Sequence, residues 1–323
     1  MVLPGVSVII TSWNGKGLLE KNLPPLVRVL RNYGGASEVI VVDDAGTDDT
    51  EIFLKDHHPE IRYLLLPVNV GNGQAMNEGA KTSRHEILLF LDNDVTVTDG
   101  FLETLVPHFE DPKIFSVGSR SISSSQDLGP FQFPRVRFRW GIFWYYYEML
   151  PPRWEKPVPV LFASAGHAAF RRKMFEELEG FDKLYGRFYL EDLDLCYRAW
   201  RKGWTSLVDP RSRVIHEAAG TIRKILSEKE IQRRQWRNRF LFTWKNIHSP
   251  SLMLQHLVWT PFESLLLPFI GKGVFTLGFL EALGHAGKAC QRRRWVKRQA
   301  LLADQEVLKK LGCYRENEDR NAF

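Results

Sequence analysis

The chain has 323 residues, of which 44% are hydrophobic and 25% are charged, a balance typical of a globular protein with a full core. Its three cysteines, Cys196, Cys290 and Cys313, lie far apart and are odd in number, which argues against a disulfide framework and a zinc site. A reducing compartment is therefore expected. No basic region or cleavage site precedes the apolar residues 6–10, so we expect no signal peptide.

The net charge of +6 conceals a difference between the two parts of the chain. Residues 1–219 carry 25 Lys and Arg against 29 Asp and Glu, a net charge of −4. Residues 220–323 carry 19 against 9, a net charge of +10. A basic C-terminal part indicates a polyanionic partner, either anionic lipid or nucleic acid, or else a solvated helical face.

Short apolar runs alternate with helical patterns over the first 120 residues. Strands are predicted over residues 6–12, 38–43, 61–66, 86–91 and 114–118, and helices over residues 16–32, 48–57, 72–83 and 99–109. This alternation predicts a parallel, doubly wound sheet of the α/β class. Such sheets bind ligands beyond the carboxyl ends of their strands, so the polar residues that follow each strand are the candidate site residues.

The later part of the chain is less regular. Residues 120–160 interrupt the alternation with an aromatic and arginine-rich segment at 131–147. Regular structure is expected again at 158–163, 171–178, 191–202 and 213–215. Beyond this point only helices are expected, with a charged amphipathic helix at 227–246, an apolar stretch at 251–283 and a basic run at 292–298.

The first acidic cluster, Asp92, Asn93 and Asp94, directly follows the apolar run 87–91. Two carboxylates one residue apart at the end of a buried strand are unfavourable unless a cation joins them. A divalent cation bound there could hold a diphosphate. The alternative is a solvated turn.

A second acidic cluster lies about a hundred residues downstream, where Glu191, Asp192 and Asp194 follow the run 188–190. These carboxylates can supply a general base, although acidic residues in a first turn also complement the helix dipole. His216 follows a short apolar strand and is either a metal ligand or a structural histidine. Together the clusters suggest metal-assisted transfer from an activated phosphate ester.

Other phosphate-binding motifs are missing or weak. There is no GxxxxGK[ST], and residues 12–17 after the first strand lack the GxGxxG spacing, which disfavours a P-loop ATPase and a dehydrogenase. Asp43 and Asp44 can accept the N3–H of a uracil or thymine ring, or serve a turn and helix cap. The glycine-punctuated segment 69–77 predicts a helix entry that favours an anion.

The order of these motifs resembles the inverting nucleotide-sugar glycosyltransferases of family 2, which have a GT-A fold and include rhamnosyltransferase-like bacterial members. The matching strings are VSVIITSWNG from Val6, EVIVVDDAGTDDT from Glu38, NVGNGQAMNEGAK from Asn69, ILLFLDNDV from Ile87, SAGHAAFRRKMFEELEGFDKLYGRFYLEDLDLCYRAWRKGW from Ser164 and VIH from Val214. The resemblance covers roughly residues 4–246. The combination is highly specific, although each piece alone is not.

This resemblance implies catalytic roles. Asp92 and Asp94 would stand in the DxD motif and hold Mg²⁺ or Mn²⁺ on the donor diphosphate, with His216 as a third metal contact. Asp192 matches the base that takes the proton of an acceptor hydroxyl as its oxygen attacks the anomeric carbon from the opposite face. Glu191 is the alternative base, or it orients the acceptor.

The resemblance also implies donor contacts. Ser12 and Trp13, with Asp43 or Asp44, would hold the base and ribose. The other expected donor-binding residues are Asn69, Gly73, Asn77, Asp92 and Asn93. The middle DxD position is Asn93, where many members have Asp, which leaves activity possible and bears on donor choice. A UDP or dTDP donor is favoured because Asp43 suits an N3–H, and GDP donors stay open.

Acceptor contacts are expected from two segments. Gly166 and His167, within residues 164–167, would form a floor under the sugar and the acceptor. Trp140 and Trp144 are expected to line an acceptor groove, because aromatic faces stack on sugar rings. The aromatic segment equally suits an amphipathic element against lipid or core.

The apolar stretch 251–283 is interrupted by Pro261, Glu263, Pro268 and Lys272, which favours a helical hairpin on a membrane surface over a spanning helix. The basic run 292–298 would then lie on anionic lipid, as suits a peripheral enzyme on the inner face of the cytoplasmic membrane. A subdomain packed on the catalytic core and a dimer interface are the alternatives. No nucleic-acid partner is expected.

We therefore predict a GT-A catalytic domain with a doubly wound, mixed sheet at residues 1–219, with a nucleotide-binding half at 1–119 and an acceptor half at 120–219, and a helical extension at 220–323. The predicted function is inverting, metal-dependent sugar transfer to a glycan or lipid-linked glycan in cell-envelope polysaccharide synthesis. A sugar-1-phosphate nucleotidyltransferase is disfavoured because residues 12–17 lack an arginine. A non-catalytic membrane-associated scaffold is disfavoured by the joint presence of Asp92, Asp94, Asp192 and His216.

Overall fold

The computed structural model describes residues 3–123, 129–216, 226–270 and 273–312. The strands are β1 (Val6–Ser12), β2 (Ser37–Asp43), β3 (Arg62–Leu65), β4 (Ile87–Asp92), β5 (Val95–Val97), β6 (Ile114–Ile122), β7 (Phe131–Arg139), β8 (Ile142–Leu150), β9 (Val158–Pro159), β10 (His167–Arg171) and β11 (Thr205–His216). The α-helices are α1 (Lys16–Tyr33), α2 (Thr50–His57), α3 (Asn72–Thr82), α4 (Phe101–Leu105), α5 (Arg172–Glu177), α6 (Glu191–Arg201), α8 (Glu228–Asn246), α9 (Pro250–Leu266), α10 (Gly273–Leu283), α11 (Ala286–Gln299) and α12 (Asp304–Lys310). Short 3-10 helices lie at η1 (Val106–Glu110), η2 (Lys183–Tyr185) and η3 (Leu267–Ile270).

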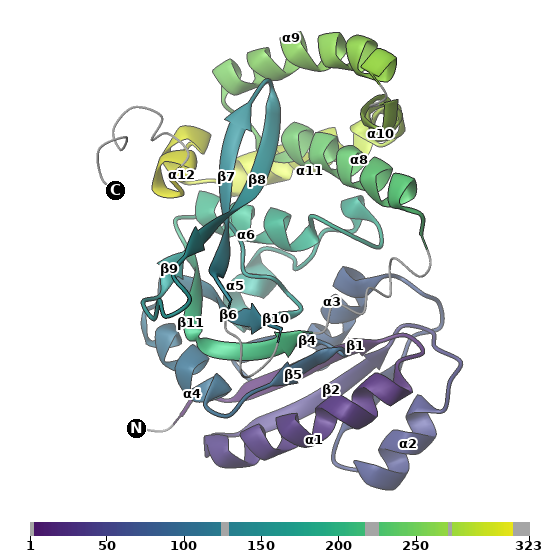
Figure 1. The fold of residues 1–323 in the computed structure, drawn as a ribbon, viewed down its shortest axis with the longest axis vertical. Coiled ribbons are helices and arrows are strands. Elements are labelled where there is room, and N and C mark those ends of the chain that lie inside the picture. Colours follow the sequence, from purple (N-terminus) through teal and green to yellow (C-terminus); the bar gives the residue numbers. More distant parts are fainter. Residues whose placement is uncertain (1–2, 124–128, 217–225, 271–272, 313–323) are drawn as a thin grey trace.

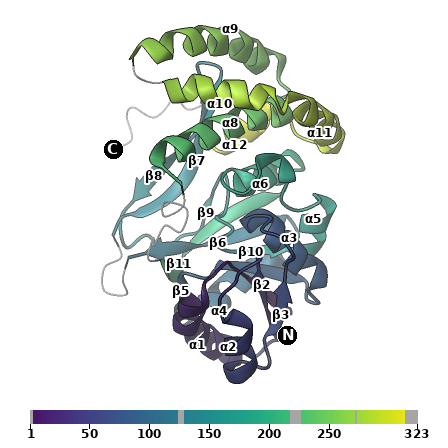
Figure 2. The same cartoon turned by 90° about the vertical axis from the view of Figure 1, so that its right-hand side faces the viewer.

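These elements form an α/β unit with a group of helices packed at one end (Figure 1). The sheet with α1 to α6 occupies the lower part of that view, and α8 to α12 lie above it. The hairpin of β7 and β8 reaches from the sheet towards the C-terminal helices, as the turned view also shows (Figure 2). The predicted α/β class is confirmed.

The described part of the main sheet has the strand order β3-β2-β1-β4-β10-β6-β11-β5, with β9 beside β11. The predicted parallel arrangement holds for β3, β2, β1 and β4. Beyond β4 the sheet is mixed, because β10 runs antiparallel to both β4 and β6. This reversed strand pairs His167 with Leu91 and so begins at the carboxyl end of β4, where the first acidic cluster starts.

The sheet is buried on both faces. Val6, Val8 and Ile10 of β1 pack with α1, α2 and α4 in one core. Ile9 points to the opposite face and packs in the core that contains α3, α5 and α6. Because both faces are covered, the strand ends provide the edge at which the polar side chains gather.

The structure contains strands that the sequence analysis did not predict. β5 is only three residues long, and β11 begins at Thr205 rather than at residue 213 because it pairs along the whole of β6. The aromatic segment forms the β7–β8 hairpin, in which buried and exposed side chains largely alternate along β7. Residues 158–163 contain only the two-residue strand β9.

The C-terminal helices expose a large apolar surface. In the described part of the chain, no helix is both long and apolar enough to cross a membrane. Outward-facing apolar side chains of α9 and α10 nonetheless include Leu254, Leu257, Val258, Phe262, Leu265, Leu277, Leu280 and Leu283. We call these eight side chains the apolar face. Lys272 and the predicted domain boundary at residues 219 and 220 lie outside the described residues.

Buried ion pairs fasten α8 to α6. The Nζ atom of Lys245 lies 2.6 Å from an oxygen of Asp182 and 2.8 Å from an oxygen of Asp194, and the Lys245 and Asp194 side chains are fully buried. Arg198 Nε lies 2.8 Å from Asp194, and Arg292 Nε of α11 lies 2.8 Å from Asp182. Because the charges are matched, the buried carboxylates stay ionised.

We predict that Lys245→Met lowers the free energy of unfolding by about 3 kcal/mol, at the low end of the effect of breaking a buried ion pair. Arg198 and Arg292 remain to compensate the two carboxylates. Urea unfolding at pH 7 measures the change. Lys229→Met, on the exposed side of the same helix, is the matched control and should change stability by less than about 0.5 kcal/mol.

The same variant should alter the pH dependence of stability. Burial opposes ionisation of Asp182, but Lys245 and two arginines lower the pKa of its carboxyl below the usual range, and the pKa of Asp194 is also lowered. Stability from these groups is present above the unfolded pKa of about 3.9 and is lost as pH falls. In Lys245→Met the free energy of unfolding should fall less on acidification below pH 4 than in the unmodified protein. An unchanged dependence of stability on pH would contradict the pairing of Lys245 with these carboxylates.

Candidate functional site

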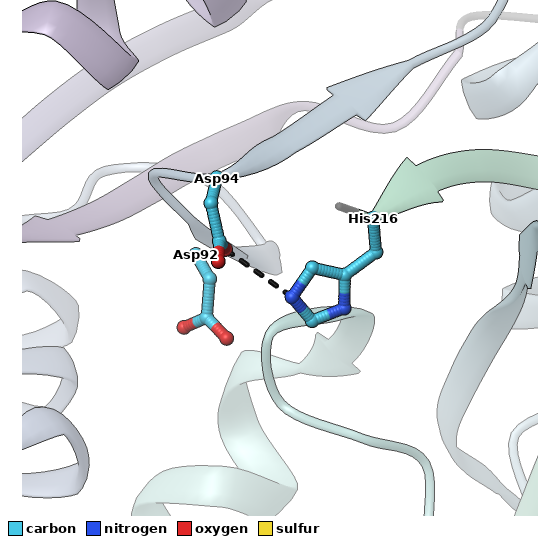
Figure 3. Close-up of side chains that lie close together, drawn as sticks. All are labelled: Asp92, Asp94 and His216. Atoms are coloured by element: carbon cyan, nitrogen blue, oxygen red, sulfur yellow. Dashed lines mark ion pairs between the residues drawn. The ribbon is translucent and has the colours of Figure 1, made fainter. Parts of the chain in front are cut away.

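Three metal-ligating side chains meet at the carboxyl end of β4. Asp92 ends this strand, Asp94 lies in the turn to β5, and His216 ends β11. β5 pairs with β11 in a register that places His216 beside Val95. Figure 3 shows the two carboxylates and the imidazole facing one another, with Asp94 Oδ1 and His216 Nε2 3.3 Å apart. One ligand atom from each residue lies within 4.8 Å of those of the others.

The charges of this cluster fit a divalent cation. Burial, followed by the neighbouring Asp94, raises the pKa of Asp92 above its usual value. The hydrogen bond to Asp94 raises the pKa of His216. Two crowded carboxylates and an imidazole provide the oxygen and nitrogen ligands that Mn²⁺ accepts, and the oxygen ligands that Mg²⁺ prefers. The residues present therefore fit such an ion.

Neighbouring residues fix the orientation of Asp92. Asn72 donates from Nδ2 to Asp92 Oδ1 at 3.1 Å, and Thr11 in turn donates to the side-chain oxygen of Asn72. The backbone N–H of Asp92 donates to the carbonyl of Gly166 at 2.8 Å. A Cβ atom on Gly166 would overlap the Asp92 carboxylate, so glycine is required for this close approach.

The second acidic cluster joins the same site through residues 164–167. The Asp192 carboxylate accepts hydrogen bonds from the backbone N–H groups of Leu193, at 2.7 Å, and Ala165. Ala165 directly precedes Gly166, which touches Asp92. Burial raises the pKa of Glu191, and the charge of Asp192 raises it further. Burial also raises the pKa of Asp192, but its two backbone donors offset part of this, which favours Asp192 as the ionised member.

Glu191 has a different environment. Its Oε2 atom is buried without a hydrogen-bond partner among the described residues. Its aliphatic part lies against the position that a Cβ of Gly73 would occupy, at 3.2 Å. Gly73 therefore makes room for Glu191 beside α3.

The two carboxylates at the end of β2 have different partners. Both oxygens of Asp44 accept backbone N–H groups, from Val70 at 2.7 Å and Gly71 at 2.8 Å, and the Asn69 side chain donates to its carbonyl. Asp44 and Asn69 thus hold the loop that leads into α3. Asp43 accepts from Gly46 N and from the hydroxyl of Tyr63, which leaves lone pairs on both oxygens.

The end of β1 lies beside the first cluster. Ser12 Oγ accepts from Asn93 Nδ2 at 3.1 Å, and the carbonyl of Asn93 accepts from Asn22 of α1. These bonds engage both the side chain and the carbonyl of Asn93 and fix the turn that carries Asp94. The Trp13 side chain is exposed directly after the strand.

His167 lies beside the metal-ligating residues. Its ring stands 6.3 Å from that of His216, and its Nδ1 atom lies 3.1 Å from Ser119 Oγ. Burial, followed by the neighbouring His216, lowers the pKa of His167 to about 4, so its ring is neutral at pH 7.

The structure does not bring three of the predicted site residues to the acidic clusters. Asn77 makes two hydrogen bonds to the backbone of Phe181. Trp140 lies in the turn of the β7–β8 hairpin, next to Gly141, whose carbonyl lies 2.7 Å from His256 of α9. The ring of Trp144 packs against Trp236 of α8. For Trp140 and Trp144 the reason is that the hairpin extends towards the C-terminal helices (Figure 1), and for Asn77 it is that its amide holds the backbone of Phe181.

Cavity size does not locate the site either. A cavity of about 540 Å³ is lined by Gln74, Asn77, Phe181, Asp182 and Arg292 among others, and by none of the metal-ligating residues.

Sequence analysis missed several side chains of this site. Asn72 lay inside a recognised string but was not assigned. Burial raises the pKa of Tyr145 and of Tyr147, the latter to about 12. Both rings lie close enough to Asp192 for its charge to add to this rise, and Tyr145 also raises the pKa of Tyr147. Arg239 of α8 lies over the Tyr145 ring at 5.4 Å. The aromatic alternation in 131–147 could have indicated the hairpin, but nothing local indicates Arg239.

Comparison with known sequences gives the same family as the motifs. Residues 7–179 match the sequence model of glycosyl transferase family 2. A polypeptide N-acetylgalactosaminyltransferase 8 of Drosophila melanogaster is 32% identical over 235 residues, which cover 66% of this chain and 38% of that protein. A pre-mycofactocin glycosyltransferase of Mycobacterium tuberculosis is 28% identical over 227 residues, which cover 65% of this chain and 44% of that protein. The chain thus spans less than half the length of these relatives.

Two solved structures are similar in fold. GalNAc-T7 with UDP, GalNAc and Mn²⁺ has a TM-score of 0.59 at 19% identity, covering 76% of this chain and 48% of that one. The Pyrobaculum calidifontis mannosyltransferase in complex with GDP-Man and Mn²⁺ has a TM-score of 0.53 at 18% identity, and the match covers 97% of this chain and 87% of that one. The second match extends over the C-terminal helices.

We predict that Gly166→Ala weakens Mn²⁺ binding by about 10- to 100-fold, because the added methyl group displaces the Asp92 carboxylate. Titration calorimetry measures the affinity. Gly17→Ala is the matched control, since its added Cβ would meet nothing within 4 Å, and it should bind Mn²⁺ like the unmodified protein. Equal affinities for all three proteins would mean that Asp92 is not a ligand.

Proposed function

Because this chain belongs to glycosyl transferase family 2, we propose that it transfers a sugar from a nucleoside-diphosphate sugar to a hydroxyl group of a glycan or lipid-linked acceptor. One observation carries the proposal. Residues 164–167 connect the metal-ligating cluster to the buried acidic pair, with Ala165 on Asp192 and Gly166 on Asp92. The N–H of Ala165 bonds the Asp192 carboxylate, and the carbonyl of Gly166 accepts the N–H of Asp92, so one backbone segment holds the candidate cation site and the candidate base side by side.

Asp92, Asp94 and His216 would hold Mn²⁺ or Mg²⁺, and the bound ion would supply positive charge to the leaving diphosphate. Asn72 and Gly166 keep Asp92 oriented for this role. Asp43, with lone pairs left on its carboxylate, would accept the N3–H of a uracil or thymine base, so a UDP or dTDP donor is favoured. Ser12 and Trp13 would flank the nucleoside, while Asp44 and Asn69 shape its loop.

Asp192 would act as the general base. Its carboxylate takes the proton of the acceptor hydroxyl as the oxygen forms a bond to the anomeric carbon. The bond from that carbon to the diphosphate oxygen breaks, and the nucleoside diphosphate leaves with the electron pair. Attack from the face opposite the leaving group inverts the configuration. Glu191, whose pKa is raised more strongly by burial and by Asp192, would stay protonated and orient the acceptor.

The C-terminal helices carry the features that suit binding to a membrane surface. The apolar face of α9 and α10 lies next in the chain to α11, whose exposed side includes Lys288, Arg294, Lys297 and Arg298. Exposed apolar side chains beside cationic ones fit an anionic bilayer surface. We propose peripheral binding to the inner face of the cytoplasmic membrane and an acceptor in cell-envelope polysaccharide synthesis.

The first expected outcome concerns turnover. Purified protein with Mn²⁺ or Mg²⁺ should release nucleoside diphosphate from one member of a panel of UDP-, dTDP- and GDP-sugars. Asp94→Asn should abolish the release, and Asp192→Asn should lower kcat by 10²- to 10⁴-fold. Asp56→Asn, on the exposed side of α2, is the control, and its kcat should stay within twofold of that of the unmodified protein.

The pH profile tests the base separately. Because burial raises the pKa of Asp192, kcat/KM should already fall at mildly acidic pH rather than only near pH 4, as the base becomes protonated. A profile flat down to pH 4, or full activity in Asp192→Asn, would remove Asp192 from this role. No nucleotide binding by calorimetry would instead favour a scaffold without transferase activity.

The membrane proposal predicts binding to vesicles. The protein should float with phosphatidylglycerol-containing vesicles at low salt and less with phosphatidylcholine alone. Leu257→Glu with Leu265→Glu, at side chains 65% and 71% exposed, should weaken binding at least tenfold. Ile52→Glu, at a side chain 59% exposed on α2, is the control and should float unchanged. Failure of the unmodified protein to float, or equal binding by all variants, would contradict the proposal.

A further inference from the structure

Helix α8 places a buried amide beside the loop that leads into α6. The side chain of Asn238 is fully buried. Its Nδ2 atom lies within hydrogen-bond distance of three carbonyl oxygens of one loop, which share its two hydrogens: those of Tyr185 at 3.1 Å, Phe188 at 3.0 Å and Tyr189 at 2.9 Å. Its Oδ1 atom accepts from Arg237 Nε at 2.9 Å. Both ends of the amide are therefore engaged, and its orientation is fixed.

The loop that receives these bonds has an unusual backbone. Tyr189 has φ 71° and Leu190 has φ 72°, so two consecutive residues with side chains adopt the left-handed conformation. Only glycine takes this conformation without strain, and adjacent non-glycine examples persist only where their surroundings hold them. The carbonyl of Leu190 accepts the N–H of Asp194, so the conformation of this pair sets the direction in which α6 begins.

We propose that Asn238 is a positioning residue for Asp192. By holding the carbonyls of Phe188 and Tyr189, it keeps the left-handed pair in the conformation that directs the first turn of α6, and with it Asp192, into the site. Asn238 touches no reacting group and acts only through this loop. The inference rests on the proposed function, which gives Asp192 the role of base.

The identity of the residue supports this role. Asparagine is a poor helix former, and this one lies in a helix interior next to buried aromatic and aliphatic side chains, where leucine would pack without a polar requirement. A leucine at 238 would remove the donor that serves Phe188 and Tyr189. The carbonyl of Tyr185 would keep a second donor, Arg237 Nη2 at 2.8 Å. The loss of the Asn238 amide should therefore change mainly the backbone of the residues directly before α6.

The loop is also tied to the outer helices. Arg237 donates to Tyr185 from one nitrogen of its guanidinium group and to Glu281 of α10 from another, at 2.9 Å. Arg237 and Asn238 thus connect the loop to a helix that carries part of the apolar face.

The test compares two buried asparagines of α8. Asn238→Leu should lower kcat by 10- to 100-fold, the loss expected when a reacting group is misplaced by about 1 Å. The donor KM and the affinity for nucleoside diphosphate with Mn²⁺ should change by less than about threefold, because the donor contacts are elsewhere. Asn246→Leu removes a buried amide that donates to Asp194 at 2.7 Å, but Lys245, Arg198 and Tyr185 still hold that carboxylate, so kcat should stay within about threefold. Asn238→Gln, which retains the amide, should recover part of the activity.

Hydrogen exchange provides a readout that does not require turnover. Amides within residues 186–193 should exchange faster in Asn238→Leu and not in Asn246→Leu. Unchanged exchange there, unchanged kcat in folded Asn238→Leu, or losses of kcat that follow thermal stability equally in both variants would overturn the positioning role. If Asn238→Leu does not fold, Asn238→Ser makes the same comparison. An unmodified protein that releases no nucleoside diphosphate would overturn the proposed function, while the exchange data would still decide what Asn238 holds.

Discussion

The ammonium group of Lys245, buried between Asp182 and Asp194, fixes helix α6 relative to the rest of the molecule. Such a group is tolerated only where its charge is matched, and here the match joins three segments: the loop before α6, α6 itself and α8. Asp192 and Asp194 lie two residues apart and therefore point about 200° apart around the helix axis. One carboxylate faces the site and the other is fixed in the ion-pair network, so the network sets the position of the candidate base.

The buried carboxylates of this protein fall into two groups, and electrostatics distinguishes them. Lysine and arginine lower the pKa of Asp182 and Asp194, as is typical of carboxylates that stabilise a fold. Burial raises the pKa of Asp92, Glu191 and Asp192, where no Lys or Arg of the described residues provides a comparable charge. Crowded, unmatched negative charge is unfavourable for folding, and such carboxylates are typical of functional sites, in line with the proposed cation site and base.

Local sequence predicted one half of the site better than the other. The run 87–91 and the acidic residues after it are contiguous, so Asp92 and Asp94 could be placed at a strand end from pattern alone. Asp43 and Asp44 look equivalent in sequence, and only the structure separates them, because the N–H groups that engage Asp44 come from residues 70 and 71. The contacts of Asn238 and Arg239 span 49 to 95 residues, and no local pattern encodes a partner at that distance.

The aromatic segment shows the opposite difficulty. Trp140 and Trp144 have the right chemistry for stacking on sugars, but the same aromatic pattern suits an element packed against lipid or core, and sequence alone does not separate the two. In the structure the hairpin extends away from the acidic clusters, and Trp144 packs on α8. Tyr145, one residue further along β8, and Tyr147 are close enough to Asp192 for its charge to add to the effect of burial on their pKa. Since successive side chains of a strand point to opposite faces, an error of one residue changes which ring reaches the site.

Buried polar contacts cross the predicted division of the chain at residue 219. Helix α6 precedes that point, yet its buried polar groups find partners beyond it. Tyr197 donates to Asp304 at 2.7 Å and Arg201 also pairs with Asp304, while Arg198 and Asp194 belong to the network around Lys245. Without α8 and α12, Asp194 would lose the charge of Lys245, and Tyr197 and Arg201 would lose Asp304, which is more unfavourable than losing apolar contacts. The C-terminal helices therefore complete the burial of α6, and an interaction at the apolar face of α9 and α10 would reach α6 through α8, on which α10 packs.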